Sequence, residues 1–318
     1  MFNQSIVYDI IYSLAANDGR EDKLFGNCAK LARDCFARSM TCDTFPEIWF
    51  EIPLAGDPWF DLHLLTSREA LGPDSRFDAT NTGGHPDAFA WFARQNGVRQ
   101  LALSWDVSAG DITAPAIQVL MSHNDPGISC GFLQANGRDD LQDAYRAFVG
   151  RIPQGWFACY TGVFPGRQHD FVRVECVVDE DLQQGYAKDA SLLENHLRQA
   201  GVREFGDTLI ERCQELARSP FHLEFQFDVI SDGSTGPTLG ASVRFAAPPG
   251  EGDWPFFDPS QQAGELMNQV EEWELADERW RLLASTTFAT RMSRAGDSAL
   301  LFCYPAFLKL LMPWQASW

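Results

Sequence analysis

The sequence is poor in positive charge. It has 25 Lys and Arg residues against 44 Asp and Glu, so its formal net charge at pH 7 is −19. A protein that binds nucleic acid through phosphate contacts needs a basic surface, and this composition argues against that class. The acidity itself mainly favours solubility and says little about the ligand.

Long apolar runs are also lacking. No window reaches the ~18 consecutive apolar residues of a membrane-spanning helix. The first residues, MFNQSIVYDIIYSLAANDGRED, have no basic start, and Asp9 interrupts their apolar stretch, so they do not resemble a signal peptide. These absences predict a soluble, cytoplasmic protein.

The residues that build metal sites and covalent catalytic sites lack the necessary spacing. The eight cysteines contain no Cys-x-x-Cys and the six histidines no His-x-x-x-His, which argues against a zinc site and a disulfide framework. Cysteines in apolar stretches are typical of small buried side chains in a reducing compartment. Gly-x-x-x-x-Gly-Lys does not occur, so a phosphate-binding loop has no anchor.

Apolar and polar residues alternate in ten short segments, which come in five close pairs. The pairs are PEIWFEIPL with WFDLHLLT, RQLALSWDV with PAIQVLMS, GWFACYTGVF with DFVRVECVV, FHLEFQFDV with TLGASVRFA, and LLASTTFATR with SALLFCYP. Each junction within a pair contains Gly, Pro, Asp or Asn, which are the residues of hairpin loops. The sequence therefore predicts five β-hairpins.

Segments with helical spacing lie before and between these pairs. They cover residues 20–40, 86–97, 138–152, 190–201, 205–219 and 260–280. With 318 residues, 45% of them hydrophobic, the chain can bury a large core, and the regular order of elements predicts a single α+β domain over residues 1–318. Ten antiparallel strands with helices outside can close into a barrel whose lumen admits ligands. An open α+β sheet is the alternative.

The polar faces of these strands are unusual for a surface in contact with water. In FHLEFQFDV the polar members are His222, Glu224, Gln226 and Asp228. Three tryptophans also fall in the strand segments, namely Trp49, Trp59 and Trp105. Charged and aromatic residues in this mixture favour the interpretation that the polar faces line an enclosed lumen, with the tryptophans as its aromatic lining.

Two segments carry a resemblance to a known family. They are LALSWDVSAGDITAPAIQVLMSHNDPG and TGVFPGRQHDFVRVECVVDEDL, the second with a Gly-Arg turn, a strand and an acidic helix start. In this arrangement the chain resembles the ABBA-type (PT-barrel) prenyltransferases, and within them the cyanobactin-type peptide prenyltransferases. The resemblance implies repeated α-β-β-α units, a closed ten-stranded antiparallel barrel with helices outside, an active site in the lumen, and a role in modifying ribosomally made peptides.

The family's chemistry assigns roles to particular residues. A ring of Arg, Lys and Tyr side chains stabilises the departing diphosphate of a prenyl diphosphate co-substrate, and aromatic rings shield the carbocation. A carboxylate near the acceptor orients it or removes a proton, and the resemblance implies that Glu47 takes this place. The residues implied for diphosphate binding are Arg173, Arg244, Arg291 and Tyr304.

The sequence departs from the family in this cationic ring. The family's second-strand Arg falls near Asp61 or His63, and its fourth-strand Arg-x-Lys becomes Ala116 and Gln118. Buried carboxylates need a cation, a proton, a metal or a positive ligand, so the excess of acids favours a positive guest. The acceptor-binding residues expected on this ground are Asp61, His63, Glu175, His222, Glu224 and Asp228.

Three hypotheses for the function follow. In the first, a diverged prenyltransferase transfers a dimethylallyl or longer prenyl group to a peptide or amino-acid side chain, such as a cationic arginine. There, Mg²⁺ held by the diphosphate and one or two carboxylates would ease the charge conflict. In the second, the barrel has lost prenyl transfer and binds, or otherwise modifies, a basic peptide or a small cation. In the third, the acids are solvated and the protein is an α+β interaction module.

Overall fold

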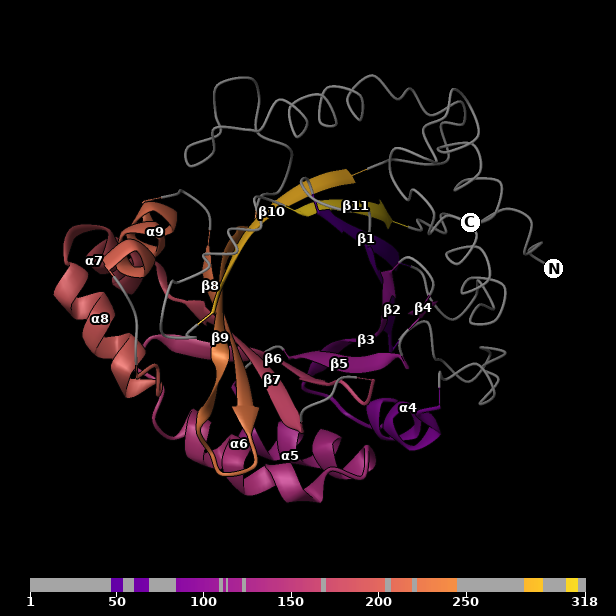
Figure 1. Ribbon diagram of the computed structural model, residues 1–318. Coiled ribbons are helices and arrows are strands. Elements are labelled where there is room, and N and C mark those ends of the chain that lie inside the picture. The colour runs from indigo at the N-terminus through magenta and orange to yellow at the C-terminus, as the bar shows by residue number, and fades with distance from the viewer. Residues whose placement is uncertain are drawn as a thin grey trace, which may run out of the picture.

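The described strands of this protein form one antiparallel sheet, and the described helices lie against one face of that sheet (Figure 1). The computed structural model describes residues 47–53, 60–68, 84–108, 111–112, 114–121, 124–166, 170–203, 207–218, 222–244, 283–293 and 307–313. The predicted mixture of helices with an antiparallel sheet is confirmed. We call the face that the helices cover the outer face and the opposite one the inner face.

The sheet has eleven strands in the described residues. They are β1 (Glu47–Pro53), β2 (Phe60–Ser67), β3 (Val98–Ser108), β4 (Asp111–Ile112), β5 (Ala116–Met121), β6 (Trp156–Val163), β7 (Phe171–Val178), β8 (Leu223–Ile230), β9 (Thr235–Arg244), β10 (Leu283–Ser293) and β11 (Phe307–Pro313). Their order is β2-β1-β11-β10-β9-β8-β7-β6-β5-β3-β4, and β2 also pairs with β3. The strands therefore curl around a common axis, along which Figure 1 looks.

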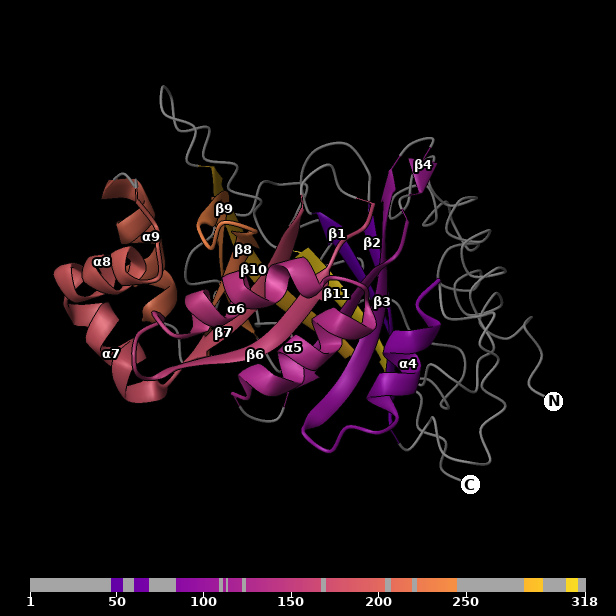
Figure 2. The same cartoon turned by 90° about the horizontal axis from the view of Figure 1, so that it is seen from below.

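The helices lie on the outer side of the strands in both views (Figures 1 and 2). They are α4 (Pro86–Phe92), α5 (Pro126–Ala135), the 3₁₀ helix η3 (Asp139–Leu141), α6 (Gln142–Val149), α7 (Glu180–Lys188), α8 (Ala190–Gln199) and α9 (Asp207–Ala217). Within the described ranges, no helix has the length and apolar character needed to cross a bilayer.

Aspartate side chains begin three of these helices. Asp125 accepts a hydrogen bond from the backbone N–H of Gly127 at 2.8 Å, and Asp179 accepts one from Leu182 at 2.8 Å. Asp189 accepts from the first-turn amides of α8 in the same way. These carboxylates satisfy amides that have no partner within the helix, which defines where α5, α7 and α8 start.

Four of the five predicted hairpins are found where the alternation placed them. The first strand of the fifth is β10, which in the described residues pairs with β11 at Phe307–Pro313. Its predicted partner, residues 298–305, lies outside the described residues. The predicted helices at 20–40 and 260–280 lie outside the described residues, and α5 and β4 were not predicted.

The core lies between the outer face and the helices. Val172, Val174, Cys176 and Val178 alternate along β7 and have no exposed surface. Phe225 and Phe227 continue this face on β8: Trp156 stacks on Phe225 at 5.0 Å between ring centres, and Phe148 of α6 lies 5.1 Å from Phe227. The outer face is therefore packed, and the polar residues between these positions lie on the inner face.

Candidate active site on the inner face

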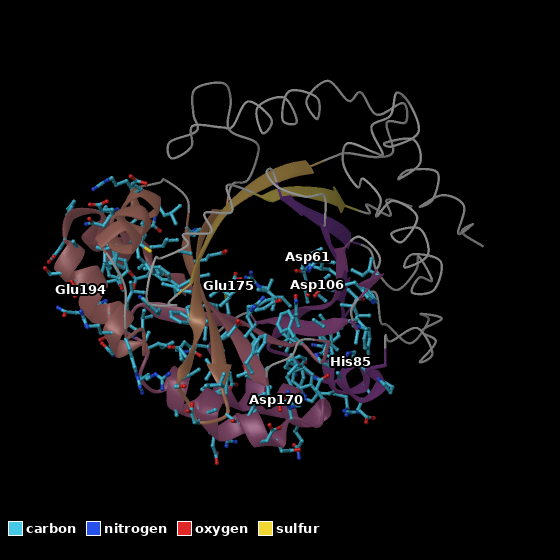
Figure 3. All side chains as sticks on the ribbon, viewed as in Figure 1. Asp61, His85, Asp106, Asp170, Glu175 and Glu194 are labelled. Atoms are coloured by element: carbon cyan, nitrogen blue, oxygen red, sulfur yellow. The ribbon has the colours of Figure 1, made fainter. Side chains whose placement is uncertain are left out.

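Cross-strand register aligns the inner-face residues of neighbouring strands. Asp61 of β2 lies opposite Asp106 of β3, and Arg173 of β7 lies opposite Asp228 of β8. Glu175 is opposite Gln226 on the same two strands. Figure 3 shows the side chains of Asp61, Asp106 and Glu175 on the concave side of the curled sheet, whereas Glu194 lies on the outer helices.

Arg173 and Asp228 form a buried ion pair on this face. The Nε of Arg173 donates to Oδ1 of Asp228 at 2.7 Å and its Nη2 donates to Oδ2 at 3.0 Å. The two side chains are only 7% and 16% exposed. Two parallel charge-assisted hydrogen bonds between a guanidinium and a carboxylate are among the strongest polar contacts in proteins.

Two aromatic rings flank the Arg173 guanidinium. Its central carbon lies 4.5 Å from the centre of the Phe164 ring and 5.5 Å from that of Phe171. The two rings stack on each other at 5.5 Å. A cation over an aromatic face is attracted by the ring quadrupole, so these rings favour a guanidinium at this place.

The surroundings of Arg173 favour its positively charged form. Burial by itself lowers the pKa of its guanidinium, but the Asp228 carboxylate outweighs burial, and Tyr160 and Asp106 add to it, so the pKa is raised above the ordinary value. Asp228 therefore stabilises the cationic form of Arg173. Its positive charge is already balanced by Asp228.

A neutral polar pair lies next to this ion pair. Gln118 Nε2 donates to Ser104 Oγ at 2.8 Å, and both residues are buried. Gly162 lies opposite both Gln118 and Arg173 in the register. A Cβ at Gly162 would lie 3.0 Å from Phe164 and 3.1 Å from Gln118. A larger residue at this position would therefore crowd these two side chains. Gln118 stands where the resemblance implied a lysine, so a hydrogen-bonded amide takes the place of a cation there.

The predicted acceptor residues differ in exposure. Asp61 and Glu224 are 8% and 5% exposed, and Glu175 is half-buried. His63 lies two residues after Asp61 in β2 and is also half-buried. His222 is different, because it precedes β8 and is exposed. The inner face therefore brings together the carboxylates, but His222 lies at the solvent-exposed start of the strand.

Other predicted residues are located by their backbone alone. Glu47 pairs with Leu65 and Trp49 with His63, which places both in line with the inner-face positions of β2. Arg244 pairs with Thr287, and Arg291 with Gly240. Trp59 and Tyr304 lie outside the described residues.

Lys309 is a position that the sequence reasoning missed. It pairs with Glu51 of β1 and with Ser285 of β10. Glu51 in turn pairs with Asp61, so a lysine belongs to the same cross-strand row as two acidic residues. The signal was the one charged residue within FLKLLMP.

Trp105 requires a correction. It was expected to line the lumen, but along β3 it alternates with Ser104 and Asp106, which belong to the inner face. It therefore shares the outer face with the fully buried Leu101 and Leu103, and it is 5% exposed. The period of two in a strand decides the face, and the aromatic character of the residue does not.

The described side chains of the inner face are mainly acidic. They include five carboxylates, on Asp61, Asp106, Glu175, Glu224 and Asp228, and one arginine, Arg173, while the backbones of Arg291 and Lys309 lie in the same cross-strand rows. Such a lining attracts cations and can accept a proton from a bound group. Among the described residues, no group of three or more His, Cys, Asp and Glu side chains is arranged to hold a metal ion.

Solved structures with a similar fold include AnaPT from Neosartorya fischeri. The match has a TM-score of 0.52 at 11% sequence identity and covers 98% of this chain and 94% of that one. A 6-dimethylallyltryptophan synthase from Micromonospora olivasterospora, in complex with DMASPP and Trp, matches at a lower TM-score of 0.48 with 12% identity over 95% and 94% of the two chains. No protein-family model and no curated protein matches the sequence. The likeness to AnaPT shows an ABBA-type fold.

Proposed function

We propose that this protein is a prenyltransferase whose acceptor is positively charged. It transfers a dimethylallyl or longer prenyl group from an allylic diphosphate to a peptide or amino-acid side chain, such as the guanidinium of an arginine. The observation that carries the proposal is the buried, carboxylate-rich inner face, in a fold shared with AnaPT. A cationic acceptor offsets the excess negative charge of this face, whereas a neutral aromatic acceptor does not.

The proposal includes a closed barrel of ten strands in a single domain. The pairing of β2 with β3 and the pairing of β1 with β11 support closure. The two residues of β4 are then an addition at the edge of β3. Closure matters for the chemistry, since it shields a carbocation from water on all sides.

The reaction assigns different tasks to the inner-face groups. The C–O bond of the allylic diphosphate breaks, diphosphate leaves with the electron pair, and a new bond forms between the prenyl carbon and an acceptor nitrogen. A guanidinium nitrogen becomes nucleophilic as it loses a proton, and Glu47 or a neighbouring carboxylate receives that proton. Arg244, Arg291, Tyr304 and Arg173 are proposed to stabilise the diphosphate, and Trp49 and Trp59 to shield the carbocation.

Magnesium has a limited place in this proposal. The described carboxylates do not form a metal site by themselves, so they do not fit a resident ion. Magnesium would enter only with the diphosphate, which commonly brings the ion and most of its ligands. No step of the reaction depends on it here.

The acceptor in this proposal is a peptide, on the resemblance to the cyanobactin-type enzymes. The protein would then act in the cytoplasm on ribosomally made peptides. The acidic inner face supports this, because a basic side chain on a peptide can enter the lumen while the peptide backbone stays outside.

A second candidate function is the binding of a basic peptide or small cation without prenyl transfer. It is favoured by the Arg173–Asp228 pair, because a guanidinium already engaged by a carboxylate is a weakened ligand for diphosphate. The inner face would then still select a positive guest.

The decisive experiment incubates the protein with dimethylallyl or geranyl diphosphate and a panel of peptides that contain Arg, Trp, Tyr or His. The proposal expects a mass gain of one prenyl unit on the Arg peptide. Calorimetry with each prenyl diphosphate separates the alternatives: binding without transfer to any peptide, or no binding of diphosphate together with binding of the Arg peptide, favours the second candidate.

A further inference from the structure

Arg173 and Asp228, for which different roles were expected, form one ion pair. Arg173 was expected to bind the diphosphate and Asp228 to bind the acceptor, but the structure joins the two side chains by two hydrogen bonds at 2.7 and 3.0 Å. The guanidinium edge formed by Nε and Nη2 is thereby occupied by Asp228. Neither residue can give its full charge to a substrate while the pair is closed.

The surroundings make each half of the pair costly to leave alone. Arg173 and Asp228 are 7% and 16% exposed, so water compensates neither charge well. Asp106 lies close enough to act on Arg173 electrostatically, and Glu175 follows in the next inner-face position of β7. An anion that binds Arg173 by itself therefore adds negative charge to a face that is already acidic, and it also leaves Asp228 without its guanidinium.

We propose that the Arg173–Asp228 pair couples the two substrate sites. The diphosphate binds Arg173, the cationic group of the acceptor binds Asp228, and the two ligands together replace one internal ion pair by two external ones. This inference rests on the proposed function, since it needs an anionic donor and a cationic acceptor on the same face.

The coupling follows from the charge balance. One ligand that binds alone must supply the whole free energy of opening the pair, and it leaves one buried charge uncompensated. The second ligand finds the pair already open and removes the uncompensated charge, so it binds more tightly. Because the coupling is a difference between equilibrium states, each ligand strengthens the other by the same factor. Phe164 and Phe171 remain against the guanidinium in both states and keep it in place.

Asp228 is therefore a positioning residue for Arg173 as well as a ligand for the acceptor. In the free protein it holds the guanidinium beside the two rings and prevents tight binding of an anion alone. A donor that arrives without an acceptor is then bound weakly, which protects the allylic diphosphate from hydrolysis in the absence of its acceptor.

The test is calorimetric and needs no turnover. Inorganic pyrophosphate stands for the donor and N-acetylarginine amide for the acceptor, at constant ionic strength and with EDTA to remove divalent ions. Each ligand is titrated into the full-length protein with and without a saturating amount of the other. The proteins are the wild type, Asp228→Asn, Arg173→Gln, the double variant, and Glu194→Gln, which removes an exposed ion pair with Arg198 on α8.

In the wild type and in Glu194→Gln, we expect each ligand to lower the dissociation constant of the other about ten-fold, within the range of measured couplings. Asp228→Asn should bind pyrophosphate more tightly and the arginine amide more weakly than the wild type. Arg173→Gln should show the reverse. Both single variants should lose the coupling. A purely structural role for the pair would shift both affinities in the same direction.

Two outcomes overturn the coupling while leaving prenyl transfer intact. In one, both ligands bind the wild type with dissociation constants that do not depend on each other. In the other, the coupling persists in the double variant, which shows that the two ligands attract each other directly. If pyrophosphate does not bind the wild type at all, the proposed function fails, and the coupling fails with it.

Discussion

The two faces of the same strands differ more than any two regions along the chain. On β7 and β8 the outer positions are Val, Cys, Leu and Phe without exposed surface, and the inner positions include Arg173, Glu175, Glu224 and Asp228. Neighbouring residues therefore serve different purposes. The outer face supplies the apolar burial that stabilises the fold, and the inner face offsets part of that stability by keeping charges out of water.

The two faces also differ in the hydrogen-bond partners of their buried polar groups. On the outer side, Trp156 Nε1 donates to Tyr186 Oη at 2.7 Å, and Tyr186 lies 2.6 Å from Nδ1 of His196, so neutral groups on β6, α7 and α8 form a chain. On the inner face a buried ion pair, Arg173–Asp228, lies beside the neutral Gln118–Ser104 hydrogen bond. Buried charge is a poor way to gain stability, and its presence on one face points to function there.

The largest effect on stability is expected from a substitution in the outer face. Phe227→Ala removes a fully buried ring that contacts Phe148 and Trp156, and it should lower the free energy of unfolding by about 3–5 kcal/mol. Urea unfolding followed by circular dichroism measures this. The neighbouring inner-face variant Gln226→Ala is the matched control and should cost less than about 1 kcal/mol. Equal costs for the two variants would contradict the division of labour between the faces.

The next largest effect on stability is expected from a substitution in the inner face. Asp228→Ala leaves the buried guanidinium of Arg173 without its carboxylate, so the free energy of unfolding should fall by about 3 kcal/mol. The double variant Arg173→Met with Asp228→Leu removes both charges, and urea unfolding should show that it recovers most of this loss. If the double variant is less stable than Asp228→Ala, the pair is a stabilising contact and the account of a costly inner face is wrong.

A smaller effect concerns the neutral chain on the outer side. Tyr186→Phe leaves the buried Trp156 Nε1 without its acceptor, and the free energy of unfolding should fall by about 2 kcal/mol. Thermal unfolding measures the change. Gln184→Ala, on the exposed side of the same helix, serves as the control. A Tyr186→Phe protein as stable as this control would show that the hydrogen-bonded chain contributes nothing.

The smallest effect depends on pH. Burial lowers the pKa of His196 below its ordinary value, and Nδ1 of its ring lies 2.6 Å from the hydroxyl of Tyr186. In the unfolded chain this histidine takes up a proton near its ordinary pKa of about 6.5. Its contribution to stability is therefore present above about pH 6.5 and is lost as the pH falls toward and through the lower pKa of the folded state.

Unfolding titrations between neutral and mildly acidic pH test this sign. His196→Gln should lose part of the acid sensitivity of the wild type, and His222→Gln, which changes an exposed histidine, should keep it. Identical pH profiles for His196→Gln and the wild type would remove His196 from the account.

The faces of individual strands could be predicted because they depend on local alternation. Leu223, Phe225, Phe227 and Val229, odd positions of FHLEFQFDV, form the outer face of β8 as expected, and β7 follows the same rule. Trp105 was assigned to the wrong face when its aromatic character was given more weight than its position between Ser104 and Asp106. The helix α5 was missed because PGISCGFLQA has two glycines and no clear apolar stripe.

The contacts that define the site could not be predicted, since they depend on register between distant segments. Arg173 and Asp228 are 55 residues apart in sequence, and only the pairing of β7 with β8 brings their side chains together. In the same way, the row of Lys309, Glu51 and Asp61 requires β11 to lie beside β1. A mainly apolar stretch from Ala299 to Met312 gives no sign of which part of it pairs.

The central claim is that the inner face selects a positively charged acceptor for prenyl transfer. Two peptides that differ only in Arg or its uncharged analogue citrulline test it most directly, each incubated with dimethylallyl diphosphate and analysed by mass spectrometry. The account predicts one added prenyl unit on the Arg peptide, and a rate at least about a hundred-fold lower on the citrulline peptide, because a buried carboxylate then lacks its partner. Equal modification of both peptides, or modification of a Trp peptide alone, would contradict it.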